Sequence, residues 1–439
     1  MTVLLQPAIL MTAVWAAFVT IYVSVPIVYD HIPGAAAWSI MAGGVVVFGA
    51  GAAMAGGADP ADRSIHDKMR YDHTIMACAV IGMLGIIAVV VDKLFLSGID
   101  WSIGITNVRE RRAVEVFENV PIHRSLLLYL GYLTFSFSCV SVTLFILVGE
   151  RLGRFAALSG QISVLPMIIY ALAYGARMPI LLLILLCVGA ALTRAVQGKS
   201  FLPSGHWMWL KLIIACIAFL IYTNQVWQNR RDTNRIADYS IFKTVSASRW
   251  EMQPSPWLDE AVSDGKLPAG PVMDWLSIGM YITHSPTTVQ RMVDHWNEIS
   301  IYGGLYQVGI LSPLTDVLAP SLKLSQNMRS QLMSAGIYGW FPNTWGAWIG
   351  DAGLVFGTIC VFVWGFLSGW VYRAVRSGAS VRTQLMLAFA YMTILISPLN
   401  GPFGMANSFL IFASFSAIGF VPLIKTAASS IRTRFLHRT

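Results

Sequence analysis

Charge is scarce in this chain of 439 residues. Only 12% of the residues are Asp, Glu, Lys or Arg, whereas 56% are hydrophobic. A soluble protein carries about 25% charged residues, so this chain lacks the polar side chains needed to cover a soluble fold of its length. The mean hydropathy of +0.63 agrees. The composition excludes a soluble enzyme, a disordered chain and a disulfide-rich secreted domain, and it predicts an all-α, polytopic integral membrane protein.

Cysteine and the common cofactor motifs are also missing or rare. The five cysteines all lie inside apolar runs, and none has the CxxC spacing of a redox or metal site. We therefore expect buried apolar side chains rather than disulfides or metal ligands. No GxxxxGK[ST], GxGxxG or HExxH motif is present, so we expect no cofactor and no metal. The net charge of +8 comes without a nucleic-acid-binding motif, so we expect no nucleic-acid partner.

Ten apolar runs are long enough to cross a bilayer, which takes about 20 helical residues. They are residues 7–29, 35–55, 74–91, 125–148, 155–173, 179–196, 207–222, 346–371, 383–399 and 405–424. Residues 269–284 and 301–320 are also apolar, but Asp274 interrupts the first and Pro313 and Asp316 the second. They are either re-entrant or interfacial pieces or two further spans. We therefore predict about 10 transmembrane helices, or 12 if both segments cross.

The short loops indicate the orientation of the chain. The first run is too long for a cleavable signal, and no Lys or Arg precedes it, so we expect it to be retained. The C-terminal tail is basic, whereas the short loops near Asp30 and Asn400 carry no Lys or Arg. Because cytoplasmic loops are enriched in Lys and Arg, both termini are predicted to be cytoplasmic.

This orientation divides the chain into three regions. Residues 1–223 form a seven-helix membrane region, and residues 224–345 form a large external loop with interfacial or re-entrant helices. Residues 346–439 form a three-helix membrane region with a basic cytoplasmic tail. The long loop is rich in basic residues, and long loops cross the membrane largely regardless of charge.

Three arginines of the external side are candidates for binding an anion. Arg177 lies in a short external loop between two spans, where basic residues are usually avoided. Its guanidinium either reaches lipid phosphates or clamps a lipid-linked phosphate. Arg230 and Arg231 follow the seventh span, where they would attract a pyrophosphate or simply belong to a polar loop.

A helix is predicted to begin at Ser285 and Pro286 and to run to Ile299. Its polar side carries a cation, two acids and an imidazole, namely Arg291, Asp294, His295 and Glu298. This face either combines a phosphate-binding Arg with a catalytic base, or it is the solvent-exposed side of a helix that lies at the membrane interface. The candidate bases are His295 and Glu298, with His284 behind them.

Two tryptophans and one acid complete the candidate residues. Trp250 and Trp257 lie in polar stretches of the large loop, where a flat ring can stack on a sugar. Asp351 lies about one turn inside the eighth span, and an acid at that depth indicates function. We expect it to hold an arginine such as Arg177, or to cap the helix mouth where substrate docks.

Two segments carry a resemblance to a known family. They are Tyr-Gly-Ala-Arg177-Met-Pro at the external turn and Asn-Thr-Trp-Gly-Ala-Trp-Ile-Gly-Asp351-Ala-Gly-Leu-Val-Phe-Gly. With the large loop before the last three spans, the chain resembles the O-antigen and exopolysaccharide repeat-unit polymerases (Wzy-type). The resemblance in architecture covers most of the chain, whereas the resemblance in motifs covers only these two segments. Some members carry Arg, ten residues and Gly, and here Gly303 follows Arg291 one residue too late.

The resemblance implies a GT-C-like glycosyltransferase of the bacterial inner membrane. It would polymerise undecaprenyl-diphosphate-linked oligosaccharide repeat units at the periplasmic face, with a flippase and a chain-length regulator as candidate partners beside the lipid bilayer. Charge builds on the departing diphosphate, so Arg177 and Arg291, then Arg230 and Arg231, are its expected ligands. His295, Glu298 or His284 would be the base, and Asp351 the organiser.

Three other function classes stay open. An O-antigen ligase or another lipid-linked-sugar transferase needs the same external cations. A polysaccharide flippase or transporter would need charges at mid-membrane, which are sparse here, and an internal repeat, which we do not find. A non-catalytic membrane scaffold is the third class.

The orientation has a direct test. A single cysteine placed in the 224–345 loop of a cysteine-free variant is expected to react with a membrane-impermeant maleimide added to intact spheroplasts, because the loop is predicted to be external. A cysteine placed in residues 425–439 should react only after lysis. Labelling in the opposite order would reverse the assignment of sides.

Overall fold

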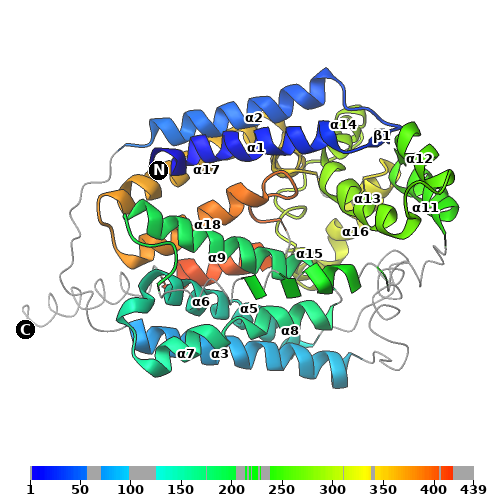
Figure 1. The fold of residues 1–439 in the computed structure, drawn as a ribbon. Helices are drawn as coiled ribbons and strands as arrows, with labels where there is room; N and C mark the ends of the chain where they lie inside the picture. The colour runs from blue at the N-terminus through cyan, green and yellow to red at the C-terminus, as the bar shows by residue number, and fades with distance from the viewer. Residues whose placement is uncertain are drawn as a thin grey trace, which may run out of the picture.

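A computed structural model describes residues 2–56, 71–97, 125–174, 176–203, 238–309, 311–337, 342–404 and 407–418, and short pieces between 213 and 228. Helix makes up 78% of the structure and strand 2%. The predicted all-α class is therefore confirmed, and the long helices lie side by side along one axis (Figure 1).

Seven helical stretches of the described residues are long and apolar enough to cross a membrane. They are α1 (Pro7–Ser24), α2 (Ala35–Met54), α3 with η3 (Tyr71–Leu96), α5 and α6 with η5 (Leu126–Arg151), α7 with α8 (Arg154–Ala173), α9 (Met178–Val196) and α17 (Thr344–Arg376). Two shorter apolar helices, α18 (Val381–Ile396) and Asn407–Ile418, match the last two predicted runs. Most of the predicted span 207–222 lies outside the described residues.

Several spans consist of more than one helix. The third ends in the π-helical turn η3 (Asp92–Leu96), and the fourth combines α5 (Leu126–Phe135), α6 (Phe137–Val148) and η5 (Gly149–Arg151). The fifth combines α7 (Arg154–Ile162) and α8 (Leu165–Ala173). A short 3₁₀ helix, η1 (Thr2–Leu5), precedes the first.

The large loop folds into short helices and one strand. These are α11 (Tyr239–Val245), η6 (Ser246–Trp250), β2 (Met252–Pro254), α12 (Pro256–Ser263), α13 (Ala269–Thr283), α14 (Ser285–Asp294), α15 (Leu311–Leu318), η7 (Pro320–Leu322) and α16 (Leu324–Ser334). Strand β2 pairs antiparallel with β1 (Ile27–Tyr29), so that Ile27 faces Pro254. The pairing ties the loop to the segment between α1 and α2.

The two interrupted apolar segments do not form helices of spanning length. Residues 269–284 give α13, which has 15 residues, and among the described residues of 301–320 the α-helix is α15, which has 8. Met273, Leu276 and Met280 of α13 are buried against β1 and α11 rather than facing lipid. Neither helix is among the described ones that are long and apolar enough to span a membrane, nor among the shorter apolar helices.

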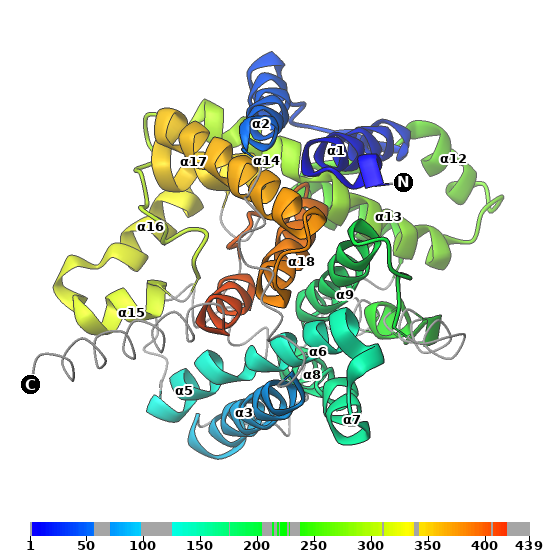
Figure 2. The same cartoon turned by 90° about the vertical axis from the view of Figure 1, so that its left-hand side faces the viewer.

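Glycine permits the closest helix contacts of the bundle. A Cβ added to Gly51 of α2 would lie 2.2 Å from the Phe362 carbonyl oxygen, and one added to Gly365 of α17 would lie 2.1 Å from that of Phe48. Gly189 of α9 meets the Ala388 carbonyl of α18 in the same way, at 2.4 Å. Such small residues let backbones approach where no hydrophobic effect drives association. The first and last membrane regions therefore form one bundle (Figure 2).

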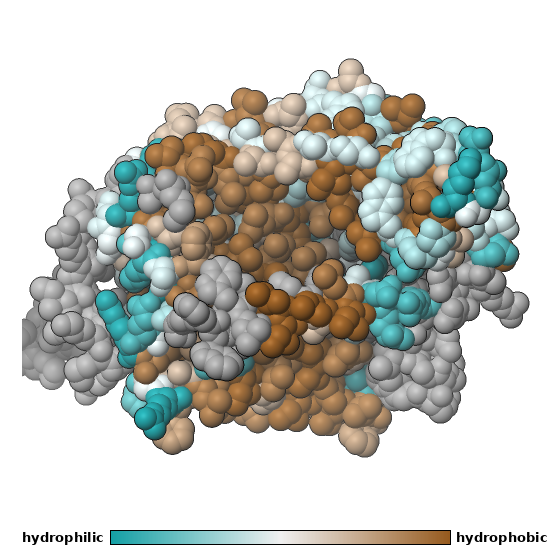
Figure 3. Space-filling model, in the orientation of Figure 1, coloured by the Kyte–Doolittle hydropathy of each residue, from teal (hydrophilic) through white to brown (hydrophobic). Residues whose placement is uncertain are grey.

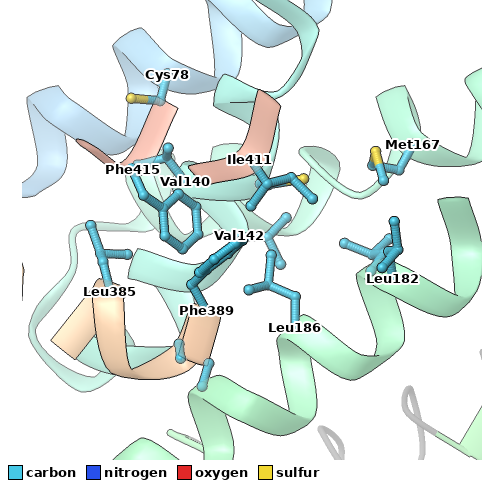
Figure 4. Packing of buried hydrophobic residues seen from close by; sticks show 14 of the residues in the cluster. Cys78, Val140, Val142, Met167, Leu182, Leu186, Leu385, Phe389, Ile411 and Phe415 are labelled. Atoms are coloured by element: carbon cyan, nitrogen blue, oxygen red, sulfur yellow. The ribbon is translucent and has the colours of Figure 1, made fainter. Parts of the chain in front are cut away.

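The largest buried cluster lies where α6, α9, α18 and the last described helix meet. Figure 4 shows Val140 and Val142 of α6 facing Leu186 of α9, with Phe389 and Phe415 closing the other side. Side chains of this kind make many small dispersion contacts, which add up because the interior is close-packed.

The two ends of the bundle differ in what they carry. The N-terminal end holds η1 and the loops 149–153 and 197–203, and the large-loop end holds the loops 25–34 and 397–404 with β2 and α11–α14 (Figure 1). A broad hydrophobic band lies between hydrophilic groups at the two ends (Figure 3). This pattern is that of a multi-pass membrane protein.

The glycine contacts give a test of the fold. Changing Gly365 to Leu is expected to destabilise the protein by about 1–3 kcal/mol, because the new side chain collides with the α2 backbone. Gly43→Leu is the matched control, since a Cβ there has no atom within 4 Å. Thermal unfolding in nanodiscs measures both variants. Equal melting temperatures for the two would contradict this packing.

Candidate functional site

The long helix α17 breaks near the large-loop end. The Asn343 side chain caps its start by accepting hydrogen bonds from the amides of Trp345 and Gly346. After Ala352 the chain takes a left-handed conformation at Gly353, with φ of 72° and ψ of 176°, which favours glycine. Broken backbone inside a membrane needs other protein groups to satisfy it.

Residues 301–309 supply the groups that satisfy this break. The amides of Tyr302 and Gly303 donate to the carbonyls of Gly350 and Asp351, at 3.2 and 2.8 Å. In return the Asp351 carboxylate accepts from the amides of Tyr306 and Gln307, at 2.9 and 2.8 Å. Asp351 is 4% exposed. Both of its carboxylate oxygens therefore hold a loop, and the expected contact with Arg177 is absent.

Arg177 lies at the start of α9, directly before the first helical turn. Its guanidinium carbon lies 5.3 Å from the centre of the Tyr281 ring, a cation–π contact. Burial lowers the pKa of Arg177, and Tyr281 and Tyr222 oppose that change. An arginine still carries its charge at neutral pH. None of the ion pairs among the described residues includes Arg177.

His284 lies beside the same tyrosine. It is 3% exposed, and its Nδ1 donates to the Tyr281 carbonyl oxygen at 2.7 Å. In a neutral imidazole the other nitrogen, Nε2, then carries the basic lone pair. The rings of Tyr281 and His284 are 5.8 Å apart. We call Arg177, Tyr281 and His284 the Arg177 cluster.

Two hydrogen bonds fix the corner between α13 and α14 that carries this cluster. The Ser285 hydroxyl donates to the Pro398 carbonyl at 2.8 Å, and the Tyr29 hydroxyl donates to the Thr283 hydroxyl at 2.6 Å. The corner is therefore held by the turn after α18 on one side and by β1 on the other. The His284 imidazole and the Tyr281 ring are therefore positioned by hydrogen-bonded elements of the fold.

Only part of the predicted polar face of 285–299 is helical, and its charged residues are paired. The helix ends at Asp294, so His295 and Glu298 lie beyond it. They pair with each other at 3.0 Å and are 36% and 63% exposed. Asp294 pairs with His31 of the α1–α2 connection at 2.8 Å. This part of the face lies in solvent.

Arg291 is also paired. Its guanidinium contacts the carboxylate of Glu251 and donates to the Gly336 carbonyl oxygen. Glu251 sits at the end of η6 in a left-handed conformation, with φ of 53°. The arginine thus joins α14 to the segment before β2 and to the end of α16, and its charge is neutralised there.

The remaining predicted residues lie in different surroundings. Trp250 packs against Phe242 with ring centres 6.3 Å apart, inside the cluster of β1, α11 and α13. Trp257 is 61% exposed in the first turn of α12. Arg230 and Arg231 lie outside the described residues.

Sequence reasoning did not single out the loop of Tyr306 and Gln307. Their contribution comes from backbone amides, which every residue carries, so the residue types give no signal. The pair Gly303-Gly304, with φ of 61° and 96°, was the available hint of a tight turn at this place.

Comparison with known proteins gives no match to any family model, curated protein or solved structure.

The carboxylate that holds the loop can be tested. Asp351→Asn should weaken the hold on residues 301–309 by about 1–3 kcal/mol, because the amide nitrogen cannot accept a hydrogen bond from a backbone amide. Faster hydrogen exchange of the Tyr306 and Gln307 amides measures the effect. Asp294→Asn, which alters an exposed ion pair, is the control and should leave these amides unchanged.

Proposed function

We propose that the protein is a GT-C-like glycosyltransferase that polymerises undecaprenyl-diphosphate-linked oligosaccharide repeat units at the periplasmic face of a bacterial inner membrane. The Arg177 cluster carries the proposal. It combines a half-buried cation that has no carboxylate partner among the described residues with a buried imidazole in the tautomer of a base. The surrounding bundle has the apolar spans that a lipid-linked substrate requires.

The chemistry needs these two groups together. The acceptor sugar hydroxyl attacks the anomeric carbon of the donor, and the bond from that carbon to the diphosphate oxygen breaks. Negative charge develops on the lipid diphosphate as it leaves, and the fixed Arg177 guanidinium stabilises it. The Nε2 of His284 accepts the hydroxyl proton. The lipid supplies the activated leaving group, so no nucleotide takes part.

The other candidate residues take secondary roles in this proposal. Arg291 can bind a diphosphate only if its ion pair with Glu251 breaks first. Arg230 and Arg231 are further ligands of the diphosphate, and the exposed ring of Trp257 is the better placed of the two tryptophans for stacking on a sugar. Asp351 organises the loop 301–309 at the break in α17 and does not touch the reacting atoms.

Two alternatives differ in what accumulates when the protein is lost. Loss of an O-antigen ligase leaves long chains on the carrier lipid, whereas loss of a polymerase leaves single repeat units on lipid A core. The break in α17 at Gly353 is a feature that transporters also use at substrate sites. Loss of a polysaccharide flippase would leave lipid-linked units on the cytoplasmic face.

The proposal predicts the effect of removing the cation. Arg177→Ala is expected to lower polymer yield by about 100-fold or more, because one fixed donor to a developing anion contributes that much. Arg291→Ala should have a smaller effect, since that charge is already paired. A polysaccharide ladder on a gel, from cells carrying each variant at equal expression, measures both.

Lys266→Ala is the control, because Lys266 is exposed and pairs only with Asp264 among the described residues. It should leave the ladder unchanged. Full-length polymer in both Arg177→Ala and Arg291→Ala would sink the assignment of the diphosphate ligands.

A further inference from the structure

An apolar cavity of about 260 Å³ opens beside α17, and no residue of the Arg177 cluster lines it. Its walls come from α17, α18, the loop before the last described helix and that helix itself. Among the lining side chains are Trp348, Val363, Val371, Phe389, Phe403 and Phe412. The lining is almost entirely hydrocarbon, and the Ser368 hydroxyl in it already donates to the Trp364 carbonyl. A water-filled or sugar-filled cavity would need polar partners that these walls do not offer.

The cavity is a groove open to the bilayer. Ile359, Val363 and Leu367, which recur at helical spacing along one side of α17, are 51%, 46% and 53% exposed. An empty space of this size would cost the protein many dispersion contacts. A hydrocarbon chain entering from the membrane restores dispersion contacts in this space and brings no polar group into it.

The length of the groove indicates which hydrocarbon chain fits. From Ile359 to Val371 the α17 wall rises about 18 Å, and Trp348 and Phe403 extend it toward the large-loop end. Val371 lies within about 8 Å of Arg376, at the N-terminal end of the bundle. An acyl chain of one leaflet covers only about 15 Å, half of the hydrocarbon core. The groove therefore suits a chain that crosses the middle of the membrane.

The two ends of the groove are not equivalent. At the large-loop end the buried indole nitrogen of Trp348 has no hydrogen-bond acceptor among the described residues. At the other end, near Val371, the polar side chain of the described lining is Ser368, whose hydroxyl already donates to the Trp364 carbonyl. A lipid with a polar head at the large-loop end and a long apolar tail pointing away from it matches this order.

We propose that this groove holds the polyprenyl chain of the lipid-linked substrate. The inference rests on the proposed function for the identity of the lipid, but it concerns only how the isoprenoid tail is bound. The groove would steady a long, flexible chain while its head group is engaged at the large-loop end.

A photoaffinity experiment tests the groove without any sugar. The full-length protein in nanodiscs is exposed to undecaprenyl phosphate carrying a diazirine at the far end of its chain, and labelled peptides are mapped by mass spectrometry. Label is expected in α17, α18 and residues 407–418. Val363→Trp narrows the groove, and losing the burial of about two methylene groups should lower labelling about tenfold.

Thr358→Trp is the matched control. It puts the same ring on the same helix, but Thr358 lines a different cavity, between α2 and α17. It should change labelling less than about twofold. Label that maps to this second cavity, or labelling that Val363→Trp does not reduce, would overturn the proposal.

Competition with the wild-type protein gives a result that does not depend on the variants folding. Unlabelled undecaprenyl phosphate should displace the probe, whereas farnesyl phosphate and added phosphatidylglycerol should not. Displacement by either short-chain lipid would overturn the proposal. Labelling requires no glycosyl transfer, so the two proposals fail separately. A protein that is labelled in the groove but makes no polymer would refute the proposed function and not the lipid-binding groove. A protein that makes polymer but is not labelled would refute the groove and not the proposed function.

Discussion

A hydrocarbon interior supplies no hydrogen-bond partners, and the large-loop end of this protein is organised around that constraint. The break in α17 at Gly353 leaves backbone carbonyls that a continuous helix would have used. Residues 301–309 satisfy two of them, and the Asp351 carboxylate holds that segment through two backbone amides. These four hydrogen bonds allow the loop to lie close against the bundle at the break. Asp351 thus acts on the site by placing backbone, which explains an acid at this depth without any contact to a reacting atom.

The charged side chains at this end fall into two groups. In the first group each side chain is paired with a complementary one. Arg291 pairs with Glu251, next to β2, and Asp294 pairs with His31 of the α1–α2 connection. His295 pairs with Glu298, just beyond the end of α14. Arg177 differs, because its neighbours are tyrosine rings rather than carboxylates. A cation kept half-buried without an acid beside it retains its attraction for an anion. Next to it, the hydrogen bond from His284 to the Tyr281 carbonyl selects a tautomer with a basic outer nitrogen.

Where prediction and structure differ, the cause is tertiary contact. Residues 269–284 have the composition of a short span, yet α13 turns one side to the cluster of β1 and α11, so its hydrophobicity serves a local core. Residues 301–320 contain a stretch without helix, in which the amides of Tyr302 and Gly303 bond to α17 carbonyls and those of Tyr306 and Gln307 bond to the Asp351 carboxylate. The predicted helix 285–299 stops at Asp294, where His295 leaves the helical conformation and caps the end through its backbone amide. For the first two segments, β1 and α17 lie far away in the sequence, so the sequence pattern gave no sign of these contacts.

Composition and the spacing of apolar residues were enough to predict a helical, multi-pass membrane protein, because a bilayer imposes the length and polarity of each span directly on the sequence. The same reasoning drew attention to Arg177 and Asp351, because a charged side chain near the end of a span needs a polar or charged partner. Which charges are paired was decided by the folded chain alone: Glu251 and Arg291 are 40 residues apart, and Tyr281 is more than a hundred residues from Arg177. Pairing depends on distances of a few ångströms between segments, and those distances exist only after the helices have packed.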